Sequence, residues 1–524
     1  MMDDARTTNR AAPLDPDRLT LDGIRGGALQ GRPVTVLGFA RSGIALTRFL
    51  ADAGADVTVY DGRPPDELSS ALAAIGDRRF RLLAGPEVDP ASAWAESHLV
   101  LTSPSINPDY PTTEPRLRDA LMVLVAARRA GDPGAPALIS EPDLVLRLCP
   151  APTIGVTGTK GKTTTASLIA AVMSTDPVHP VLLGGNIGTP LVERLPEMTS
   201  DHRVVIELSE LQLPTLSRGT TVAVFTIVTS DHLDRHGTLA AYRSVKRRLA
   251  ELVDPLGAVV LNLEDPVSAA YASIGTAPVV PYRVDGPVPG GLGVVDGWIV
   301  ATGVQRLEIA GGGVAATGPG GRIMPVDELA VPGRHNVSNA LAAVATGLLF
   351  GVAPDAIRRG AAGFAGVEHR LEVVGMIDGV RFVNDSQGTQ PDAVIAALRA
   401  FEGPLVLIAG GRSKGVDLGE LPAVVAQRAL AAVLIGESAD ELAGRFGSAG
   451  LSRIERASTL QEAVGIADGI ARDALAAGRE GPATVLLSPA AASFDMFADY
   501  AARGDAFRTA AADLARERAR GAAR

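Results

Sequence analysis

The sequence has almost no cysteine and no long apolar run. Its single cysteine, Cys149 among 524 residues, cannot form an internal disulfide and leaves no cysteine cluster to hold a structural metal. No apolar run approaches the roughly 20 residues that cross a bilayer, and residues 1–30 mix Asp, Arg and Pro instead of forming a signal segment. We therefore expect a cytoplasmic chain without membrane insertion.

The sequence also has fewer positively charged than negatively charged residues. The 49 Lys and Arg residues against 59 Asp and Glu residues give a net charge of −10. Such a chain lacks the broad basic surface with which proteins hold nucleic acid, although a local basic pocket for a small anion is compatible with it. We expect small-molecule partners and no nucleic acid.

Short Val, Ile and Leu runs alternate with Ala-rich stretches, a pattern typical of parallel sheets covered by helices on both faces. The chain is therefore predicted to be an α/β protein of three domains. Residues 1–150 form a Rossmann-like domain whose first ~30 residues are an extension, residues 151–331 a central P-loop ATPase-type domain with a mainly parallel sheet, and residues 332–524 a second Rossmann-like domain. The Gly-rich residues 283–330 are expected to form hairpins or an irregular insertion.

Residues 153–165 pass from an apolar strand through glycines into a helix, as in a nucleotide phosphate loop. Its tightest part reads Gly158-Thr159-Lys160-Gly161-Lys162-Thr163-Thr164. Backbone N–H groups can wrap a polyphosphate there, Lys162 can reach the β- and γ-phosphates, and the Thr163 hydroxyl can ligate Mg²⁺. Val156 stands where the general spacing has glycine, and a plain turn is the alternative. We predict that the chain binds ATP.

A weaker nucleotide signal lies in the first domain. Residues 38–43 follow a strand and Asp61 closes the next one, which resembles a dinucleotide-binding fingerprint with Ala40 in place of the middle glycine. Because the chain has a separate phosphate loop and no complete redox domain, we interpret this segment as the holder of a nucleotide-like substrate. A tight structural turn is the alternative.

Polar residues follow the strands of the central domain. Glu207 lies in the apolar run 204–208, where Mg²⁺ would relieve the cost of a buried carboxylate; an ion pair with Arg or Lys is the alternative. Residues 230–236 form a polar cluster beyond the next strand, where open α/β sheets place their chemistry, and His232 is the candidate metal ligand there.

Lys246 interrupts the apolar stripe of the next predicted helix, which Thr238 can cap. The stripe recurs at helical spacing through Leu239, Tyr242, Leu249 and Val253. A desolvated lysine tends to lose its proton, and a neutral amine can add CO₂ to become a carbamate, an anionic ligand for Mg²⁺. The alternative is a lysine that extends from the stripe edge into water.

Over nearly its whole length the chain resembles the Mur ligase family. Shared motifs occur at residues 158–164, 185–188, 207–209, 231–235, 333–340, 369–372 and 384–386. Residues 488–495 and 503–505 are similar to the glutamate-adding members. The resemblance implies an ATP-dependent amide-bond ligase that adds D-glutamate to UDP-N-acetylmuramoyl-L-alanine through an acyl phosphate, in peptidoglycan precursor synthesis. It also implies two Mg²⁺ ions, and we expect a monomer.

The resemblance also implies a role for individual residues. Lys162 would hold the phosphates, Thr163 and Glu207 one Mg²⁺, and His232 with carbamylated Lys246 a second. The residues assigned to adenosine, besides the phosphate loop, are Asn336, Asn339, Arg370 and Asp385. The UDP-linked substrate is assigned to Asp61, Arg63, Ser103, Asn186 and Gln212, and glutamate to Thr389, Lys414, Ser493 and Tyr500. The alternative for Lys414 is a plain surface lysine in the glycine-rich turn 410–415.

Two departures from the family pattern keep alternatives open. Gln387 and Gln390 stand where the family usually has Lys and Asn. An L-glutamate-adding variant, another Mur ligase and a folylpolyglutamate-type ligase therefore remain alternatives. Outside the ligases, the alternatives are a regulatory P-loop NTPase and a nucleotide-binding module without chemistry. With the adenosine residues placed in the third domain and the phosphate loop in the second, we also expect domain closure on substrate.

Overall fold

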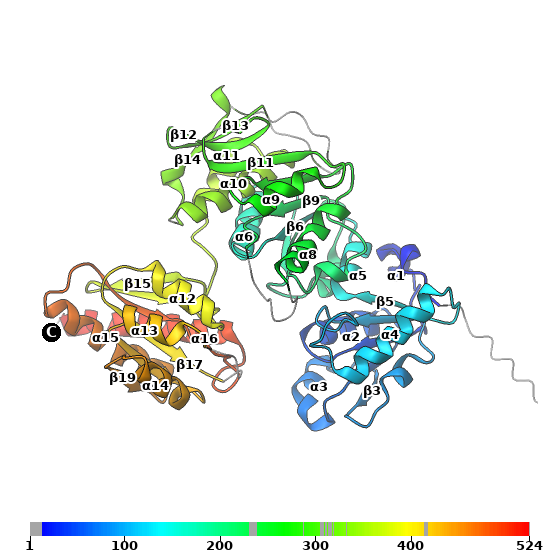
Figure 1. The fold of residues 1–524 in the computed structure, drawn as a ribbon, viewed down its shortest axis with the longest axis horizontal. Coiled ribbons are helices and arrows are strands. Elements are labelled where there is room, and N and C mark those ends of the chain that lie inside the picture. Colours follow the sequence, from blue (N-terminus) through cyan, green and yellow to red (C-terminus); the bar gives the residue numbers. More distant parts are fainter. Residues whose placement is uncertain are drawn as a thin grey trace, which may run out of the picture. The chain divides into compact units, whose positions relative to one another are not determined.

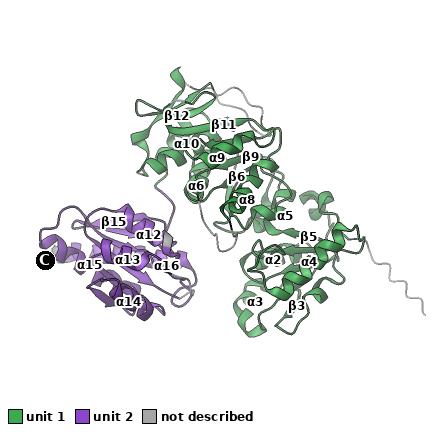
Figure 2. Cartoon of the chain, in the orientation of Figure 1, with its two compact units in different colours: residues 1–365 green, residues 366–524 purple. Residues whose placement is uncertain are grey.

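The chain forms three β-sheets with their associated helices, within two compact units. The computed structural model describes residues 13–522 except 230–237, 287, 304–308, 310–311, 313–316, 318, 332 and 413–417. Unit 1 spans residues 1–365 and unit 2 spans residues 366–524 (Figure 2). The first two sheets belong to unit 1 and the third to unit 2 (Figure 1).

The first sheet is parallel, with strand order β3-β2-β1-β4-β5. Its strands are β1 Pro33–Leu37, β2 Asp56–Asp61, β3 Arg81–Ala84, β4 Leu99–Thr102 and β5 Ala137–Ser140. The helices of this region are α1 Leu21–Arg25, α2 Arg41–Asp52, α3 Ser69–Ile75, α4 Pro115–Arg129 and α5 Glu141–Leu148. Strand β4 is buried throughout, as expected for a parallel strand covered on both faces. The Rossmann-like prediction is confirmed.

The central sheet has the order β14-β13-β12-β11-β10-β9-β6-β8-β7. Its strands are β6 Thr153–Thr157, β7 Val181–Gly185, β8 Arg203–Glu207, β9 Val222–Phe225, β10 Ala258–Asn262, β11 Val279–Asp285, β12 Gly291–Val295, β13 Trp298–Thr302 and β14 Arg322–Pro325. Strands β6 to β12 pair in parallel, whereas β12, β13 and β14 pair antiparallel. The described part of the Gly-rich segment therefore forms hairpins, one of the two predicted arrangements.

The helices around this sheet are α6 Lys162–Met173, α8 Leu239–Leu252, α9 Pro266–Ala270, α10 Arg334–Leu349 and α11 Pro354–Ala362. Helix α10 is buried from residue 338 to residue 349 and contacts α6, β10 and β11. Helices α10 and α11 therefore belong to unit 1, although they follow the boundary predicted at residue 332. The third block begins at residue 366 instead, because the apolar α10 covers the central sheet.

The third sheet has the order β15-β16-β20-β17-β18-β19 and is parallel except for the β15–β16 hairpin. Its strands are β15 Glu372–Ile377, β16 Val380–Asn384, β17 Leu405–Gly410, β18 Ala431–Ile435, β19 Ile454–Arg456 and β20 Ala483–Leu487. Its helices are α12 Pro391–Ala400, α13 Leu421–Arg428, α14 Ala439–Ser448, α15 Leu460–Ala476 and α16 Tyr500–Ala522. Separate apolar clusters pack α15 and α16 on one face and α12, α13 and α14 on the other.

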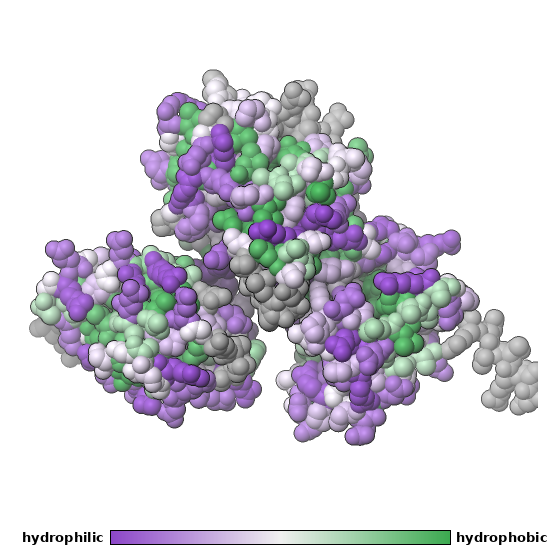
Figure 3. Space-filling view, viewed as in Figure 1, coloured by the Kyte–Doolittle hydropathy of each residue, from purple (hydrophilic) through white to green (hydrophobic). Residues whose placement is uncertain are grey.

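The N-terminal extension is part of the fold of unit 1. Leu19, Leu21, Ile24 and Leu29 are buried in its core, and Arg25 donates hydrogen bonds to the carbonyls of Pro196 (2.9 Å) and Met198 (3.0 Å). Hydrophilic residues are spread over the visible surface of both units, with smaller hydrophobic areas between them (Figure 3). Within the described part of the chain, every helix is too short or too polar to span a bilayer.

Candidate active site

The predicted phosphate loop joins β6 to α6. Gly161 stands before the first turn of α6 with φ of 86°, a left-handed conformation that favours glycine. A Cβ atom at this position would lie 2.7 Å from Asn339 Oδ1. Lys162 opens the helix and donates from Nζ to the carbonyl of Thr159 (3.0 Å), and the first turn contains no acidic residue. An ammonium and the N–H groups of a helix start therefore lie together, as anion binding requires.

Helix α10 places two predicted adenosine residues beside this loop. Thr165 Oγ1 donates to Asn339 Oδ1 (3.1 Å), and Asn339 Nδ2 donates to Asn336 Oδ1 (3.2 Å). The other two, Arg370 and Asp385, lie in unit 2. The expectation that all four belong to the third domain was therefore wrong for the two asparagines, because their helix packs on α6.

Glu207 ends strand β8 with its carboxylate almost fully buried, at 1% exposure. Its Oε1 accepts a hydrogen bond from Asn186 Nδ2 (2.9 Å), whereas its Oε2 has no hydrogen-bond partner among the described residues. No ion pair with Arg or Lys is seen in that part of the chain, so the predicted alternative is not found. A buried carboxylate oxygen without a donor fits a cation ligand, because a cation would offset its lost hydration.

Lys246 is fully buried in helix α8, at 0% exposure, so the water-exposed alternative was wrong. Its Nζ donates to Thr157 Oγ1 (3.3 Å) and lies 5.5 Å from the centroid of the Tyr242 ring. Thr238 caps the helix as predicted, since its Oγ1 accepts from the N–H of Ala241 (3.1 Å). Burial disfavours the charged form of an amine, which is compatible with carbamate formation.

Residues that support the loop were missed in the sequence. Thr159 Oγ1 lies 2.9 Å from the hydroxyl of Tyr242, and Thr226 Oγ1 donates to the carbonyl of Lys160 (2.7 Å). Tyr242 belonged to the predicted apolar stripe, and its hydroxyl was the overlooked signal. His232, with the cluster at 230–236, and Lys414 lie outside the described residues.

A pocket of about 700 Å³ opens at the carboxyl edge of the first sheet. Asp61 and Arg63 line it, together with Ser105 and, from the central region, Leu211. Asp61 Oδ2 accepts from the N–H of Phe39 (2.8 Å), and Asp61 Oδ1 accepts from Arg63 Nε (3.0 Å). Burial pushes the pKa of Asp61 upward, but the bonds from Arg63 outweigh it and hold this pKa below its usual value. Asp61 is therefore an anion that fixes the turn after β1.

The other predicted substrate residues lie less directly at this pocket. The hydroxyl of Ser103 lies 3.1 Å from that of Ser105, which lines the pocket. Asn186 neighbours Glu207, because its N–H also donates to the Glu207 carbonyl (2.9 Å). Gln212 is buried, and its Oε1 accepts from the N–H (2.9 Å) and hydroxyl (3.0 Å) of Ser209. The side chain of Gln212 thus holds a loop of unit 1.

In unit 2, Asp385 follows β16 at the carboxyl edge of the sheet. Its Oδ2 accepts from Ser488 Oγ (2.6 Å) and its Oδ1 from the N–H of Leu371 (3.2 Å). Burial raises the pKa of Asp385 to about 6, although the bond from Ser488 and the charge of Arg370 oppose this rise.

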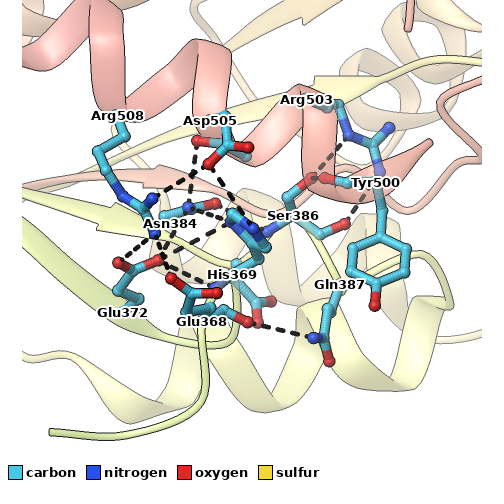
Figure 4. A network of polar contacts seen from close by, with 12 residues as sticks. Glu368, His369, Glu372, Asn384, Ser386, Gln387, Tyr500, Arg503, Asp505 and Arg508 are labelled. Carbon is cyan, nitrogen blue, oxygen red and sulfur yellow. Dashed lines mark hydrogen bonds and ion pairs between the residues drawn. The ribbon is translucent and has the colours of Figure 1, made fainter. Parts of the chain in front are cut away.

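The predicted glutamate residues of unit 2 lie on neighbouring segments. Thr389 is half-buried in the loop after β16, Ser493 is buried after β20, and Tyr500 opens α16 with its side chain partly exposed. Ser386 Oγ donates to the Tyr500 carbonyl (2.7 Å), which joins the first segment to the helix (Figure 4). Gln387 donates from Nε2 to the carbonyl of Glu368 (3.1 Å), so this departure from the family pattern has a local partner.

Comparisons with known proteins agree over most of the chain. The Mur ligase middle domain matches residues 156–347, and the Mur ligase glutamate ligase domain matches residues 369–490. UDP-N-acetylmuramoylalanine–D-glutamate ligases from Pelotomaculum thermopropionicum, Roseiflexus sp. and Symbiobacterium thermophilum are each 36% identical to it. These alignments cover 91%, 92% and 92% of this chain and 96%, 98% and 98% of the relatives. A MurF structure from Acinetobacter baumannii shares the fold, with a TM-score of 0.51 at 15% identity over 95% of this chain and 98% of that chain.

Proposed function

The chain belongs to the Mur ligase family, and from this premise we infer how its residues divide the work of an ATP-dependent ligase. It is a D-glutamate-adding ligase of peptidoglycan precursor synthesis, like relatives 36% identical over more than nine-tenths of its length. Its substrates are ATP, UDP-N-acetylmuramoyl-L-alanine and D-glutamate. One observation carries the proposed roles: the buried Lys246 and a buried Glu207 oxygen without a hydrogen-bond partner among the described residues both belong to the sheet and helices around the phosphate loop.

The reaction must first convert a poor electrophile into a good one. An oxygen of the alanyl carboxylate attacks the γ-phosphorus of ATP, the bond from that phosphorus to the bridging oxygen breaks, and ADP leaves. The glutamate amine then attacks the carbonyl carbon of the acyl phosphate and loses a proton. The bond from that carbon to the phosphate oxygen breaks, so that inorganic phosphate leaves and the amide remains.

We propose that Lys162 and the first turn of α6 hold the transferred phosphate, with Thr163 and Glu207 as ligands of one Mg²⁺. His232 and carbamylated Lys246 would hold a second, an assignment that rests on the family resemblance for His232. Bound Mg²⁺ would neutralise charge where two anions must approach. Glu207 Oε2, which has no donor in the part of the chain that the structure describes, supports the first site, and the full burial of Lys246 supports the carbamate.

The remaining assignments follow the substrates. We propose that the pocket at Asp61 and Arg63 takes the UDP-linked substrate. Ser103, Asn186 and Gln212 are assigned to the same substrate on the family resemblance. Adenosine is assigned to Asn336, Asn339, Arg370 and Asp385, and glutamate to Thr389, Lys414, Ser493 and Tyr500. We further propose that the chain acts as a monomer in the cytoplasm; light scattering during size-exclusion chromatography tests the monomer.

A heavy-oxygen label tests the acyl phosphate. UDP-N-acetylmuramoyl-L-alanine is labelled in both oxygens of the alanyl carboxylate and incubated with ATP, Mg²⁺ and D-glutamate. The mechanism predicts that one labelled oxygen leaves with the inorganic phosphate and one stays in the amide. Phosphate without label would contradict the acyl phosphate, because it would mean that water, and not the carboxylate, had attacked ATP.

A further inference from the structure

Arg503 lies in the polar network of unit 2 without a task in the reaction above (Figure 4). It belongs to the first turns of α16, and its side chain is among the largest that are fully buried, at 1% exposure. Burial lowers the pKa of Arg503 to about 10, and the nearby charge of Asp495 acts against this shift. No ion pair joins its guanidinium to a carboxylate within the described residues.

The guanidinium instead donates to neutral oxygens on two loops. Nε donates to Ser386 Oγ (3.0 Å) and Nη2 to the Ser386 carbonyl (2.9 Å), while Nη1 donates to the Ala491 carbonyl (3.3 Å). A buried charge without an ionic partner is a costly way to stabilise a fold, and apolar side chains of similar volume often do as well. Its fork of donors, however, fixes the distance between two backbone segments as an apolar group would not.

The two loops are neighbours by topology. Ser386 follows β16 and Ala491 follows β20, strands that pair in parallel, so both loops leave the same edge of the sheet. The N–H of Ala490 donates to the Gly388 carbonyl (2.9 Å), a further link between them. The loop after β17 is linked to the loop after β20, since the N–H of Arg412 donates to the Ala492 carbonyl (2.9 Å).

The helix that carries Arg503 is itself closely seated. A Cβ atom at Gly504 would lie 2.1 Å from His369 Nδ1, so only glycine lets α16 approach this ring. Asn384 Nδ2 donates both to His369 Nδ1 (3.0 Å) and to the Gly504 carbonyl (3.3 Å). The backbone beside Arg503 is thus held against the end of β16. This contact fixes the position from which the Arg503 side chain extends.

We propose that Arg503 is a positioning residue for the amino-acid substrate, because it sets the spacing between the loops 385–390 and 488–493. These loops carry Thr389 and Ser493, so the inference rests on the glutamate site proposed above. The side chain of Arg503 acts through the loops, since it is buried within unit 2.

The test compares Arg503→Ala and Arg503→Lys with Arg518→Ala, a control on the same helix whose ion pairs with Asp378 and Asp468 lie at its other end. The KM for D-glutamate and for the UDP-linked substrate, kcat and the melting temperature are measured for each. We expect Arg503→Ala to raise the KM for D-glutamate at least about tenfold, since small misplacements cost that much or more. The KM of Arg503→Lys for D-glutamate should lie between those of wild type and Arg503→Ala, because one ammonium cannot hold both loops.

The KM for the UDP-linked substrate should stay within about twofold of wild type, because its pocket lies in unit 1. Free guanidinium at millimolar concentration should partly restore the alanine variant, a rescue that a merely structural role would not show. Equal rises in both KM values, an unchanged KM for D-glutamate, or a lysine variant that fails to fold while Arg518→Ala folds would each overturn the inference. Wild-type turnover that ignores D-glutamate would overturn the proposed function itself, and the inference with it.

Discussion

At the scale of single residues, burial of charge decides which side chains can do chemistry. Glu207 and Lys246 are both removed from water, yet the described residues give Glu207 Oε2 no donor and give Lys246 Nζ a hydroxyl, Thr157 Oγ1. A buried carboxylate oxygen without a donor is a costly way to stabilise a core, because uncompensated buried charge costs roughly several kcal/mol. The proposed role as a Mg²⁺ ligand would account for the Glu207 oxygen, and the proposed carbamate for the burial of Lys246.

Replacement of Glu207 by glutamine tests its proposed role as a Mg²⁺ ligand. The amide keeps the size of the side chain but removes the charge, so the Mg²⁺ concentration for half-maximal rate should rise at least about tenfold. The control is Glu251→Gln on the surface of α8, where the carboxylate pairs with Arg247 and Arg248. An unchanged Mg²⁺ requirement in Glu207→Gln would remove this residue from the metal site.

Replacement of Lys246 by alanine tests the carbamate. We expect kcat to fall by about a hundredfold or more, as for the loss of a group that holds a catalytic metal, and added bicarbonate should not restore it. Arg247→Ala, one residue further along α8 and paired with Glu251 at the surface, should retain activity. Full activity of Lys246→Ala would contradict the carbamate.

Several residues of the site were predictable because their chemistry conflicts with their surroundings. A glutamate inside an apolar strand and a lysine inside an apolar stripe were both visible in the sequence. Arg503 was not, because nothing in its local sequence shows that the guanidinium is buried between two loops more than a hundred positions apart in the chain. Tyr242 was likewise read as an apolar residue, since the sequence does not show what its hydroxyl contacts.

At the scale of elements, the turn from β6 into α6 requires glycine at position 161, and this requirement can be tested by substitution. Gly161→Ala would strain a left-handed position by roughly 1 kcal/mol and press a Cβ atom against Asn339 Oδ1. We expect the KM for ATP to rise about tenfold, because the loop and Asn339 must both shift. Gly131→Ala is the matched control: its φ is 79°, but no atom lies within 4 Å of the added Cβ. It should cost stability alone, and equal KM values for ATP in the two variants would contradict the prediction.

The start of α5 should make unit 1 less stable as the pH rises. Glu141 is buried, and burial raises its pKa to about 7, opposed by the Val192 N–H and by Arg41. The folded chain therefore keeps this proton up to a higher pH than the unfolded chain, whose glutamate titrates near 4.5. The stability that the protonated form contributes is complete below pH 4.5 and is lost as the pH rises through 7.

Glu141→Gln stays neutral and removes this dependence. Urea unfolding should show it to be roughly 3 kcal/mol more stable than wild type at pH 8, with a difference that shrinks toward pH 5. Glu96→Gln, at an exposed position, controls for the loss of one surface charge. A stability difference that is the same at both pH values would show that the burial of Glu141 is not the cause.

The helices and strands were easier to predict than the elements against which they pack. The buried runs predicted at residues 204–208 and 258–262 form the strands β8, shifted by one residue to 203–207, and β10, because continuous apolar residues of this length suit a parallel sheet with both faces covered. The boundary at residue 332 was wrong for a related reason. Pro332-Gly333 does interrupt the chain, but the apolar helix α10 that follows is buried against α6. Packing decides where a unit ends, and a local break in the sequence does not show how the next helix packs.

At the scale of the whole molecule, the substrates are served by separate parts of the chain. The phosphate loop, the Asp61 pocket and the two asparagines proposed for adenosine belong to unit 1. The proposed glutamate site belongs to unit 2, as do Arg370 and Asp385, the other residues proposed for adenosine. Such a division is typical of enzymes that bind their substrates one by one and exclude water before the reaction. It follows that ATP should not be consumed at an appreciable rate unless every substrate is present.

The most direct test of the central claim is phosphate release from ATP in the presence of UDP-N-acetylmuramoyl-L-alanine and Mg²⁺, with D-glutamate, with L-glutamate or with neither. A D-glutamate-adding ligase predicts rapid release with D-glutamate and little with the other two mixtures, despite Gln387 and Gln390 in place of the usual Lys and Asn. Release that prefers L-glutamate would contradict the stereochemical assignment, and release that ignores both amino acids would contradict the ligase itself.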